Sequence, residues 1–249
     1  MAKTIVITGA GDGLGRALAR RFAADDDTVV LLGRTASKVE AVAAEIGPRH
    51  LAVQCDVADS ASVSAAFRQI AERHPRIGVL INNAAVFEPF TLAEVSDEQI
   101  HSQLSINLAG TIYCAREALP LLTPGGHIVN VTSESLHIKM PMLWLYAATK
   151  GAVETISDMW VRELQPQGVR VTVVRAGQMY DETKTSAGWS PELSMRFAQE
   201  NAAVGIDIRK RPLSHYNSVT DVFRAVLDTP ADVHIPFVAI SGHRATSAS

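Results

Sequence analysis

Short runs of apolar, mostly β-branched residues recur along this chain, and stretches with helical spacing lie between most of them. Strand and helix in repetition is the pattern of a parallel sheet covered by helices on both faces. The runs are nearly continuous rather than alternating, which indicates strands buried on both sides. The expected strands are Thr4–Thr8, Val29–Leu32, Leu51–Cys55, Val79–Ile81, His127–Thr132, Val169–Val174 and Ile235–Ile240. We therefore predict an α/β fold with a doubly wound, seven-stranded parallel sheet.

The length of 249 residues suits one domain, and no linker rich in serine, glycine or proline divides the chain. We assign residues 1–249 to that single domain. Residues 177–218 differ from the rest because they are polar and mixed, and we expect them to form a lid within the domain. Trp189, Phe197 and the apolar residues 140–145 are expected either to line an apolar pocket or to pack in the core or against another subunit.

The charge and the apolar runs exclude several classes of partner. A net charge of −3 gives no electrostatic basis for binding nucleic acid or an acidic membrane surface. We interpret the basic run Arg209–Arg211 as a solvated face or loop. No run approaches the ~20 apolar residues that cross a bilayer, and the first residues lack a signal peptide's apolar segment.

Cys55 and Cys114 have no metal-ligand spacing. We expect a cytoplasmic protein with no metal site.

The stretch TGAGDGLG, residues 8–15, places four glycines directly after the first expected strand and before an amphipathic helix. Glycine disfavours both helix and strand, so the backbone turns sharply here or lies close to another group. A pyrophosphate binds in such an arrangement, because N–H groups at the helix start point toward it and the helix dipole favours negative charge. A tight structural turn is the alternative interpretation.

The spacing of Thr8, Gly9, Gly13 and Gly15 differs from the Gly-x-Gly-x-x-Gly of the common dinucleotide fold. Further motifs follow in order: Asp56-Val57, Asn82-Asn83-Ala84-Ala85, Asn107 in SINLAG, Ser133, and Tyr146-x-x-x-Lys150. Together they resemble the short-chain dehydrogenase/reductase family. The resemblance implies a Rossmann-type domain and an NAD(P)-dependent oxidoreductase that interconverts a ketone or aldehyde and an alcohol by hydride transfer.

The resemblance also implies the roles of individual residues. Tyr146 exchanges a proton with the substrate oxygen, Ser133 holds that oxygen, Lys150 binds the nicotinamide ribose, and Asn107 helps to order a water. Tyr146 and Lys150 share a helix face, so the ammonium is expected to lower the tyrosine pKa from about 10. The expected catalytic residues are Asn107, Ser133, Tyr146 and Lys150. The expected cofactor-binding residues are Gly9, Asp12, Gly13, Leu14, Gly15, Arg34, Asp56, Val57, Asn83, Ala84, Tyr146, Lys150 and Gly177.

The residues after the second strand bear on the choice of nicotinamide cofactor. An acidic residue there would bind a ribose 2′-OH, but the sequence reads Leu32-Gly33-Arg34-Thr35. A guanidinium suits phosphate, so we predict NADP rather than NAD. Asp12 is the opposing observation: its carboxylate is expected to face solvent, to cap the helix or to discourage the extra phosphate.

The sequence departs from the family's motifs at three places. The family's Pro-Gly after the sixth strand is Ala176-Gly177 here, Ala85 replaces a glycine, and the Asp-Gly-Gly ending is missing.

We expect a fairly apolar small-molecule substrate and, by resemblance, a homodimer or homotetramer joined through the helices near 101–119 and 147–164. The alternative function is a non-catalytic member of the fold that senses the nucleotide or binds a protein.

Overall fold

The central sheet contains seven parallel strands in the order β3-β2-β1-β4-β5-β6-β9 within the residues that the structure describes. This computed structural model describes residues 2–182, 188–230 and 232–243. The strands are β1 (Thr4–Thr8), β2 (Thr28–Gly33), β3 (Leu51–Gln54), β4 (Ile77–Asn82), β5 (Leu122–Ser133), β6 (Arg170–Ala176) and β9 (Phe237–Ile240). The predicted fold class is confirmed, and so is the seventh strand, which pairs in parallel with β6.

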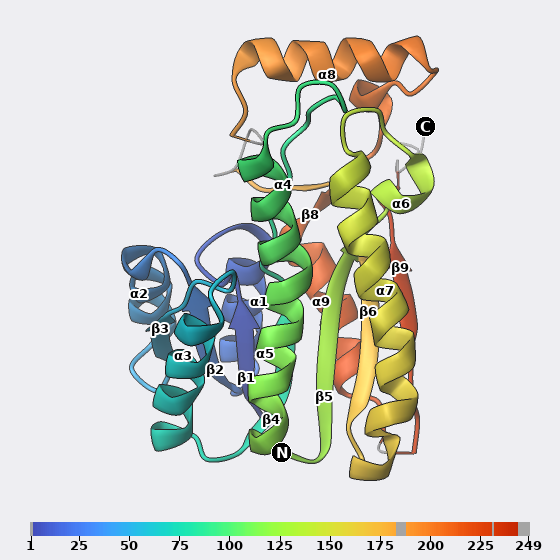
Figure 1. Cartoon of the computed structure of the whole chain (residues 1–249). Coiled ribbons are helices and arrows are strands. Elements are labelled where there is room, and N and C mark those ends of the chain that lie inside the picture. The colour runs from blue at the N-terminus through green and yellow to red at the C-terminus, as the bar shows by residue number, and fades with distance from the viewer. Residues whose placement is uncertain (1, 183–187, 231, 244–249) are drawn as a thin grey trace, which may run out of the picture.

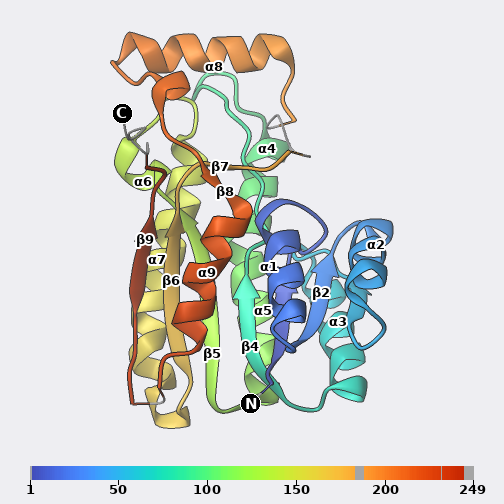
Figure 2. The same cartoon turned by 180° about the vertical axis from the view of Figure 1, so that it is seen from behind.

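Helices cover both faces of the sheet, which gives three layers (Figures 1 and 2). On one face lie α1 (Gly13–Ala24), α2 (Ala36–Ile46) and α9 (Tyr216–Leu227). On the other lie α3 (Ser60–Arg73), α5 (Gly110–Ala118) and α7 (Trp144–Leu164). Alternate strand residues serve the two layers: Ile5 and Ile7 of β1 pack toward α1, and Val6 packs toward α3 and α5. This two-sided burial explains why the strands read as continuous apolar runs.

Two shorter helices lie outside these layers. The helix α4 (Asp97–Gln103) continues through a π-helical turn (Leu104–Ala109) into α5, and α6 (Ser135–Ile138) follows β5. The helix α3 is capped by Asp59, whose carboxylate accepts the N–H of Ala61 at 2.9 Å. No helix in the described ranges is both long and apolar enough to span a bilayer.

The segment expected to form a lid contains defined structure wherever the chain is described; residues 183–187 lie outside the described ranges. The strands β7 (Met179–Tyr180) and β8 (Ser214–His215) pair with each other, and α8 (Pro191–Ala203) lies across the top of the molecule (Figure 1). Phe197 of α8 packs in a buried cluster with Met142 and Leu143. Core packing is therefore confirmed for these three residues, whereas Trp144 is exposed.

The expected solvated loop at the basic run is only partly correct. Lys210 pairs with Asp207, but Arg211 is half-buried and its guanidinium lies 2.7 Å from a carboxylate oxygen of Glu134. The charge of Glu134 draws Arg211 inward, a contact that local sequence does not reveal.

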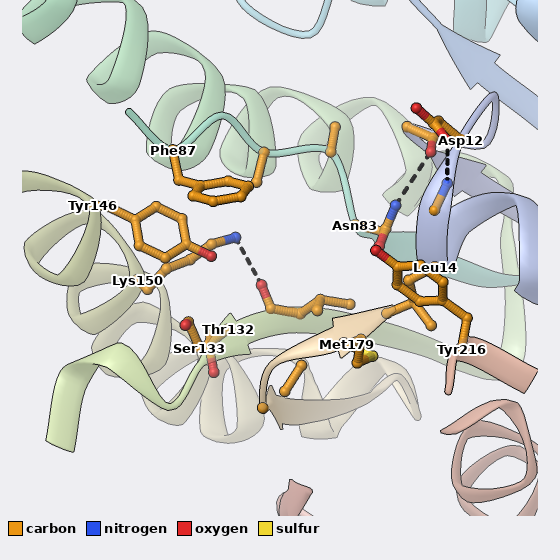
Figure 3. Close-up of a pocket in the computed structure, with 17 residues that line it drawn as sticks. Asp12, Leu14, Asn83, Phe87, Thr132, Ser133, Tyr146, Lys150, Met179 and Tyr216 are labelled. Atoms are coloured by element: carbon orange, nitrogen blue, oxygen red, sulfur yellow. Dashed lines mark hydrogen bonds between the residues drawn. The ribbon is translucent and has the colours of Figure 1, made fainter. Parts of the chain in front are cut away.

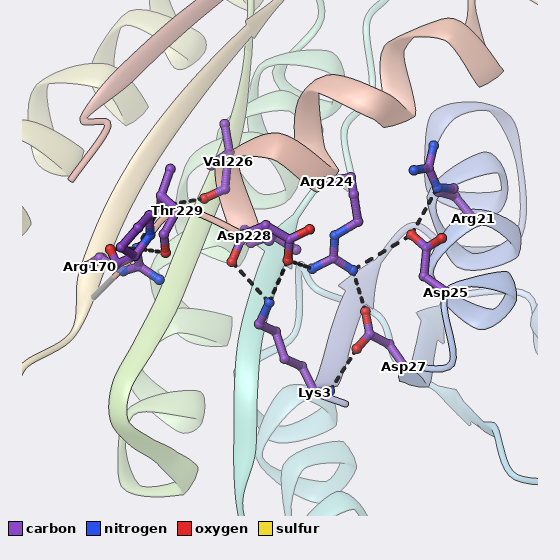
Figure 4. A network of polar contacts seen from close by, with 11 residues as sticks. Lys3, Arg21, Asp25, Asp27, Arg170, Arg224, Val226, Asp228 and Thr229 are labelled. Atoms are coloured by element: carbon purple, nitrogen blue, oxygen red, sulfur yellow. Dashed lines mark hydrogen bonds and ion pairs between the residues drawn. The ribbon is translucent and has the colours of Figure 1, made fainter. Parts of the chain in front are cut away.

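A polar network fastens α9 to the amino-terminal end of the sheet (Figure 4). The guanidinium of Arg224 contacts Asp27 at 2.5 Å and Asp228 at 2.6 Å. The ammonium of Lys3, just before β1, donates to Asp228 at 3.0 Å, and its backbone N–H donates to Asp27 at 2.7 Å. This end of α9 is therefore fixed, and its first residue, Tyr216, is held at the opposite end of the sheet.

Candidate active site

A cavity of about 390 Å³ lies at the carboxyl ends of β1, β4, β5 and β6 (Figure 3). The strand order reverses between β1 and β4, which is where open α/β sheets bind ligands. The lining residues are Gly9, Asp12, Gly13, Leu14, Asn83, Ala84, Ala85, Phe87, Val131, Thr132, Ser133, Tyr146, Lys150, Ala176, Gly177, Met179 and Tyr216. The fold thus brings most of the expected site residues to one place, although the motifs are far apart in the chain.

The glycine turn lacks side chains where backbone segments meet. Gly9 has φ +65°, and a Cβ at Gly15 would lie 2.2 Å from the carbonyl oxygen of Gly9. The Nδ2 of Asn83 fixes the turn by donating to the carbonyl oxygens of Thr8 at 3.0 Å and Gly9 at 3.3 Å. The helix α1 then begins at Gly13, beside the cavity. Bare backbone and a positive helix end fit the diphosphate of a dinucleotide.

Asp12 caps α1 and also faces solvent, which are two of the three roles expected for it. Its Oδ1 accepts the N–H of Gly13 at 2.7 Å. The ammonium of Lys38, from α2, lies 3.7 Å from Oδ2. Both side chains of this pair are well exposed, so the pair adds little stability, but it offsets the charge of Asp12. The carboxylate is therefore not an isolated negative charge beside the glycine turn.

Tyr146 and Lys150 lie on one face of α7 and reach the same cavity (Figure 3). Lys150 is 3% exposed, and its ammonium donates to the carbonyl oxygen of Val131 at 2.9 Å. The ammonium nitrogen lies 5.9 Å from the centre of the Tyr146 ring. Burial lowers the pKa of Lys150 to about 8. The lysine is thus held beside the tyrosine by the end of β5.

The pKa of Tyr146 is raised by burial, and a hydrogen bond with Ser133 acts in the opposite direction. The prediction that Lys150 lowers this pKa is therefore wrong for this structure. Burial disfavours the charged phenolate, and the ammonium of Lys150 is directed at the carbonyl oxygen of Val131. The phenol keeps its proton at neutral pH, which is the form that can donate to a substrate oxygen.

Ser133 ends β5, where its side chain both caps the following turn and lines the cavity. Its Oγ accepts the N–H of Ser135 at 3.2 Å, which helps to start α6. The same side chain lines the cavity next to Tyr146. Capping and a place in the site are therefore compatible.

Asn107 lies in the π-helical turn, is fully buried and does not line the cavity. Its Oδ1 accepts the N–H of Val86 at 2.8 Å, and its Nδ2 donates to the carbonyl oxygen of Val86 at 2.9 Å. Nδ2 also lies 3.2 Å from the hydroxyl of Thr149. The side chain therefore anchors the segment after β4, and it holds the neighbouring Phe87 in place. A π-helical turn at this position is in keeping with a functional site.

Four expected cofactor residues lie outside the cavity. Gly15 is buried behind the glycine turn. Arg34 is exposed after β2, and its guanidinium has no hydrogen-bond partner among the described residues. Asp56 accepts the N–H of Ala58 at 3.0 Å, and Val57 is buried. Arg34 and Asp56 follow neighbouring strands at the same sheet edge as the cavity.

Sequence reasoning missed several residues that line the cavity, above all Phe87, Met179 and Tyr216. Phe87 lies 5.7 Å from Tyr146, ring centre to ring centre. Met179 lies in β7 and Tyr216 begins α9, near the two ends of residues 177–218. A positional signal was available for Phe87 and Met179, because they follow β4 and β6, which end at the carboxyl edge of the sheet. Among the described residues, no three His, Cys, Asp or Glu side chains form a group that could hold a metal ion.

Comparison with known proteins agrees with this geometry. Residues 3–210 match the sequence profile described as short chain dehydrogenase. The chain is 35% identical over 208 residues to meso-2,3-butanediol dehydrogenase of Serratia marcescens, covering 82% of this chain and 80% of that one. This chain belongs to the short-chain dehydrogenase/reductase family. It is an NAD(P)-dependent oxidoreductase that acts on CH–OH groups, with a nucleotide cofactor and a small-molecule substrate.

Two further similarities extend the comparison. Sorbitol dehydrogenase of Cereibacter sphaeroides is 30% identical over 178 residues, which is 70% of each chain. The crystal structure of a 3-ketoacyl-(acyl-carrier-protein) reductase from Brucella melitensis, complexed with NADH, has a TM-score of 0.78. That structure is 26% identical, and the match covers 96% of both chains.

Proposed function

We propose that this enzyme interconverts a carbonyl compound and an alcohol, with Tyr146 as the acid–base residue. The observation that carries the proposal is the meeting of Ser133, Tyr146 and Lys150 in the cavity that the glycine turn borders. The bound nicotinamide supplies the hydride chemistry. The hydroxyl of Ser133 holds the substrate oxygen, and the Tyr146 phenol gives it a proton during reduction.

Lys150 and Asn107 have supporting roles in this proposal. The buried ammonium of Lys150, held by the carbonyl oxygen of Val131, binds the nicotinamide ribose. Asn107 acts indirectly rather than by ordering a water itself, since its side chain is already bonded to Val86 and Thr149. Its contribution is therefore to hold the wall of the cavity in place.

We further propose that NADPH is preferred over NADH. No carboxylate directly follows β2 to repel a 2′-phosphate, and the guanidinium of Arg34 is exposed at that place. Asp12 is engaged with Gly13 and offset by Lys38, which weakens the argument against NADP. A guanidinium offers charge-assisted hydrogen bonds to phosphate oxygens.

The proposed substrate carries an apolar substituent. Phe87 is 38% exposed although it lines the cavity, and its ring lies beside Tyr146. The indole of Trp189 meets the Phe87 ring edge-on at 5.4 Å, and its N–H donates to the Phe87 carbonyl oxygen at 3.2 Å. A fixed aromatic face next to the proton donor gains free energy when an apolar group covers it. In this proposal residues 177–182 and 188–218, the described parts of the expected lid, cover that substrate.

We also propose a homodimer or homotetramer that uses the expected helices. Leu104, Ile112, Trp144 and Met159 are exposed large apolar residues in or beside α5 and α7. Exposed apolar side chains on neighbouring helices are typical of subunit contacts. Sedimentation analysis of the purified protein reports its assembly state directly, and a monomer would contradict this part of the proposal.

The first test of the proposed function is thermal melting with NADPH and with NADH. A ligand at about 100 times its Kd stabilises the folded protein by about 2.7 kcal/mol. We expect the larger rise in melting temperature with NADPH. A panel of phenyl-substituted and small aliphatic ketones, with NADPH absorbance as the readout, then tests turnover. A larger shift with NADH would contradict the assigned preference, and no shift with either would contradict the cofactor site.

A further inference from the structure

Glu134, the residue after Ser133, joins three segments at the edge of the cavity: the end of β5, the loop after β6 and the segment that carries Arg211. The Oε1 of Glu134 accepts the backbone N–H of Gln178, two residues beyond β6, at 3.2 Å. The same carboxylate oxygen lies 2.7 Å from the guanidinium of Arg211, which lies between α8 and β8. A Cβ at Gly177 would lie 3.3 Å from Oε2, so the carboxylate packs closely against that loop.

The backbone of Glu134 is fixed as well, so its carboxylate has a defined position. Its N–H donates to the carbonyl oxygen of Ala176 at 3.0 Å, which extends the pairing of β5 with β6 by one residue. Its carbonyl oxygen accepts the N–H groups of His137 at 3.0 Å and Ile138 at 3.2 Å. The side chains of Glu134 and Arg211 are 18% and 26% exposed, so the pair is partly shielded from water. Such a pair is stronger than an exposed one.

Each of the three joined segments contributes a residue to the cavity (Figure 3). Ser133 precedes Glu134, Met179 follows Gln178, and the segment that carries Arg211 continues through β8 to Tyr216. Without Arg211, a bare carboxylate would stand one residue from Ser133. The substrate oxygen gains negative charge there during reduction, and an unpaired negative charge nearby would oppose it.

We infer that Glu134, paired with Arg211, is a positioning residue for the nicotinamide end of the site. It sets the place of the Ser133 hydroxyl and of the loop Gly177–Met179, while the glycine turn binds the adenosine and diphosphate part independently. The inference rests on the proposed roles of Ser133 and Tyr146. It predicts that breaking the pair weakens binding of the nicotinamide end and lowers turnover, and that binding of the adenosine and diphosphate part is unchanged.

The test compares Glu134→Gln, Arg211→Gln and Arg211→Lys with a matched control. Glu94→Gln breaks the exposed pair between Glu94 and Arg196, which fastens α8 to the loop before α4 and does not line the cavity. Binding of NADH and NADPH is measured by nicotinamide fluorescence. Binding of ADP-ribose, which lacks the nicotinamide, is measured by calorimetry. Turnover is followed with the ketone from the panel that the wild-type protein reduces fastest.

Glu134→Gln and Arg211→Gln are expected to weaken NADH and NADPH binding about tenfold, which is about 1.4 kcal/mol. Turnover should fall by a similar factor, and ADP-ribose affinity should stay within about twofold. Arg211→Lys keeps the charge and should retain most of both properties, and Glu94→Gln should match the wild type. A merely structural role would lower the melting temperature without separating ADP-ribose from NADH.

Two results would overturn the inference. One is an equal loss of affinity for NADH and ADP-ribose in Glu134→Gln. The other is wild-type binding and turnover after the pair is removed. A parallel Tyr146→Phe variant separates this outcome from failure of the proposed function. If Tyr146→Phe is inactive while Glu134→Gln is normal, only the positioning role is wrong; if Tyr146→Phe turns over normally, the acid–base assignment itself is wrong.

Discussion

Replacing Gly15 by alanine places a methyl group where the glycine turn has no room. The new Cβ would lie 2.2 Å from the carbonyl oxygen of Gly9 and 2.7 Å from the Nδ2 of Asn83. Contacts of this kind relax only when carbon and oxygen separate to van der Waals distance, so the turn or α1 must shift by roughly 1 Å. After such a shift Asn83 cannot keep both of its hydrogen bonds, because its Nδ2 donates to the carbonyl oxygens of Thr8 and Gly9.

The expected cost follows from those two hydrogen bonds. Leaving partly buried polar groups without partners costs about 1–3 kcal/mol each, so we expect Gly15→Ala to lower the free energy of unfolding by about 2–3 kcal/mol. For a chain of this length that corresponds to a melting temperature lower by roughly 5–10 °C. The shifted N–H groups of α1 should weaken NADPH binding at least about tenfold.

Gly78→Ala is the matched control. A Cβ at Gly78 would meet no atom closer than 3.5 Å, which is ordinary contact. Thermal unfolding and NADPH fluorescence titration of both variants make the comparison. A Gly15→Ala protein that melts and binds NADPH like the Gly78→Ala protein would refute the argument that the turn is sterically closed.

Three further predictions use the same purified protein. Arg34→Ala should weaken NADPH binding about tenfold by fluorescence titration and leave NADH little changed, because only NADPH carries the 2′-phosphate. Phe87→Ala should lower kcat/KM for phenyl ketones about tenfold relative to small aliphatic ketones, because the apolar face is lost. Burial lowers the pKa of His127 from 6.5 to about 3, while its Nε2 bonds the Thr172 hydroxyl at 2.8 Å. Between these values the unfolded chain binds a proton that the folded protein does not, so His127 should cost up to about 1.4 kcal/mol per pH unit as pH falls. His127→Gln should lack that slope in urea unfolding.

Each of these predictions has a result that contradicts it. Equal weakening of NADPH and NADH in Arg34→Ala would count against a phosphate contact. An unchanged preference among ketones in Phe87→Ala would remove Phe87 from substrate recognition. Parallel curves of unfolding free energy against pH for the wild type and His127→Gln would show that His127 does not set the slope.

Local spacing made the fold and the core of the site predictable. The glycine turn, Ser133 and the Tyr146–Lys150 pair each belong to a short motif, and each motif follows a strand or lies on one helix face. Parallel strands deliver their carboxyl ends to the same edge, so motifs that are far apart in sequence meet there. The continuous apolar runs specified the sheet because helices bury both of its faces.

The features of the site that the sequence did not predict depend on contacts between distant segments. Tyr216 lies in the cavity at the start of α9, whose far end is anchored by contacts of Arg224 with Asp27 and of Leu227 with Lys3. Nothing near Tyr216 in the sequence records that anchor. Arg211 looks like part of a solvated basic run until Glu134 is placed beside it. The pKa of Tyr146 was mispredicted for a related reason: the pair spacing gives the distance to Lys150, but the burial of the phenol appears only in the assembled fold.

The most direct test of the central claim is the turnover of Tyr146→Phe, measured together with its affinity for NADPH. The substitution removes only the hydroxyl that we assign to proton transfer, and it keeps the ring that packs beside Phe87. We expect ketone reduction to fall by about 100-fold or more while NADPH binding stays within about threefold. Turnover at the wild-type rate would contradict the assignment of Tyr146 as the acid–base residue.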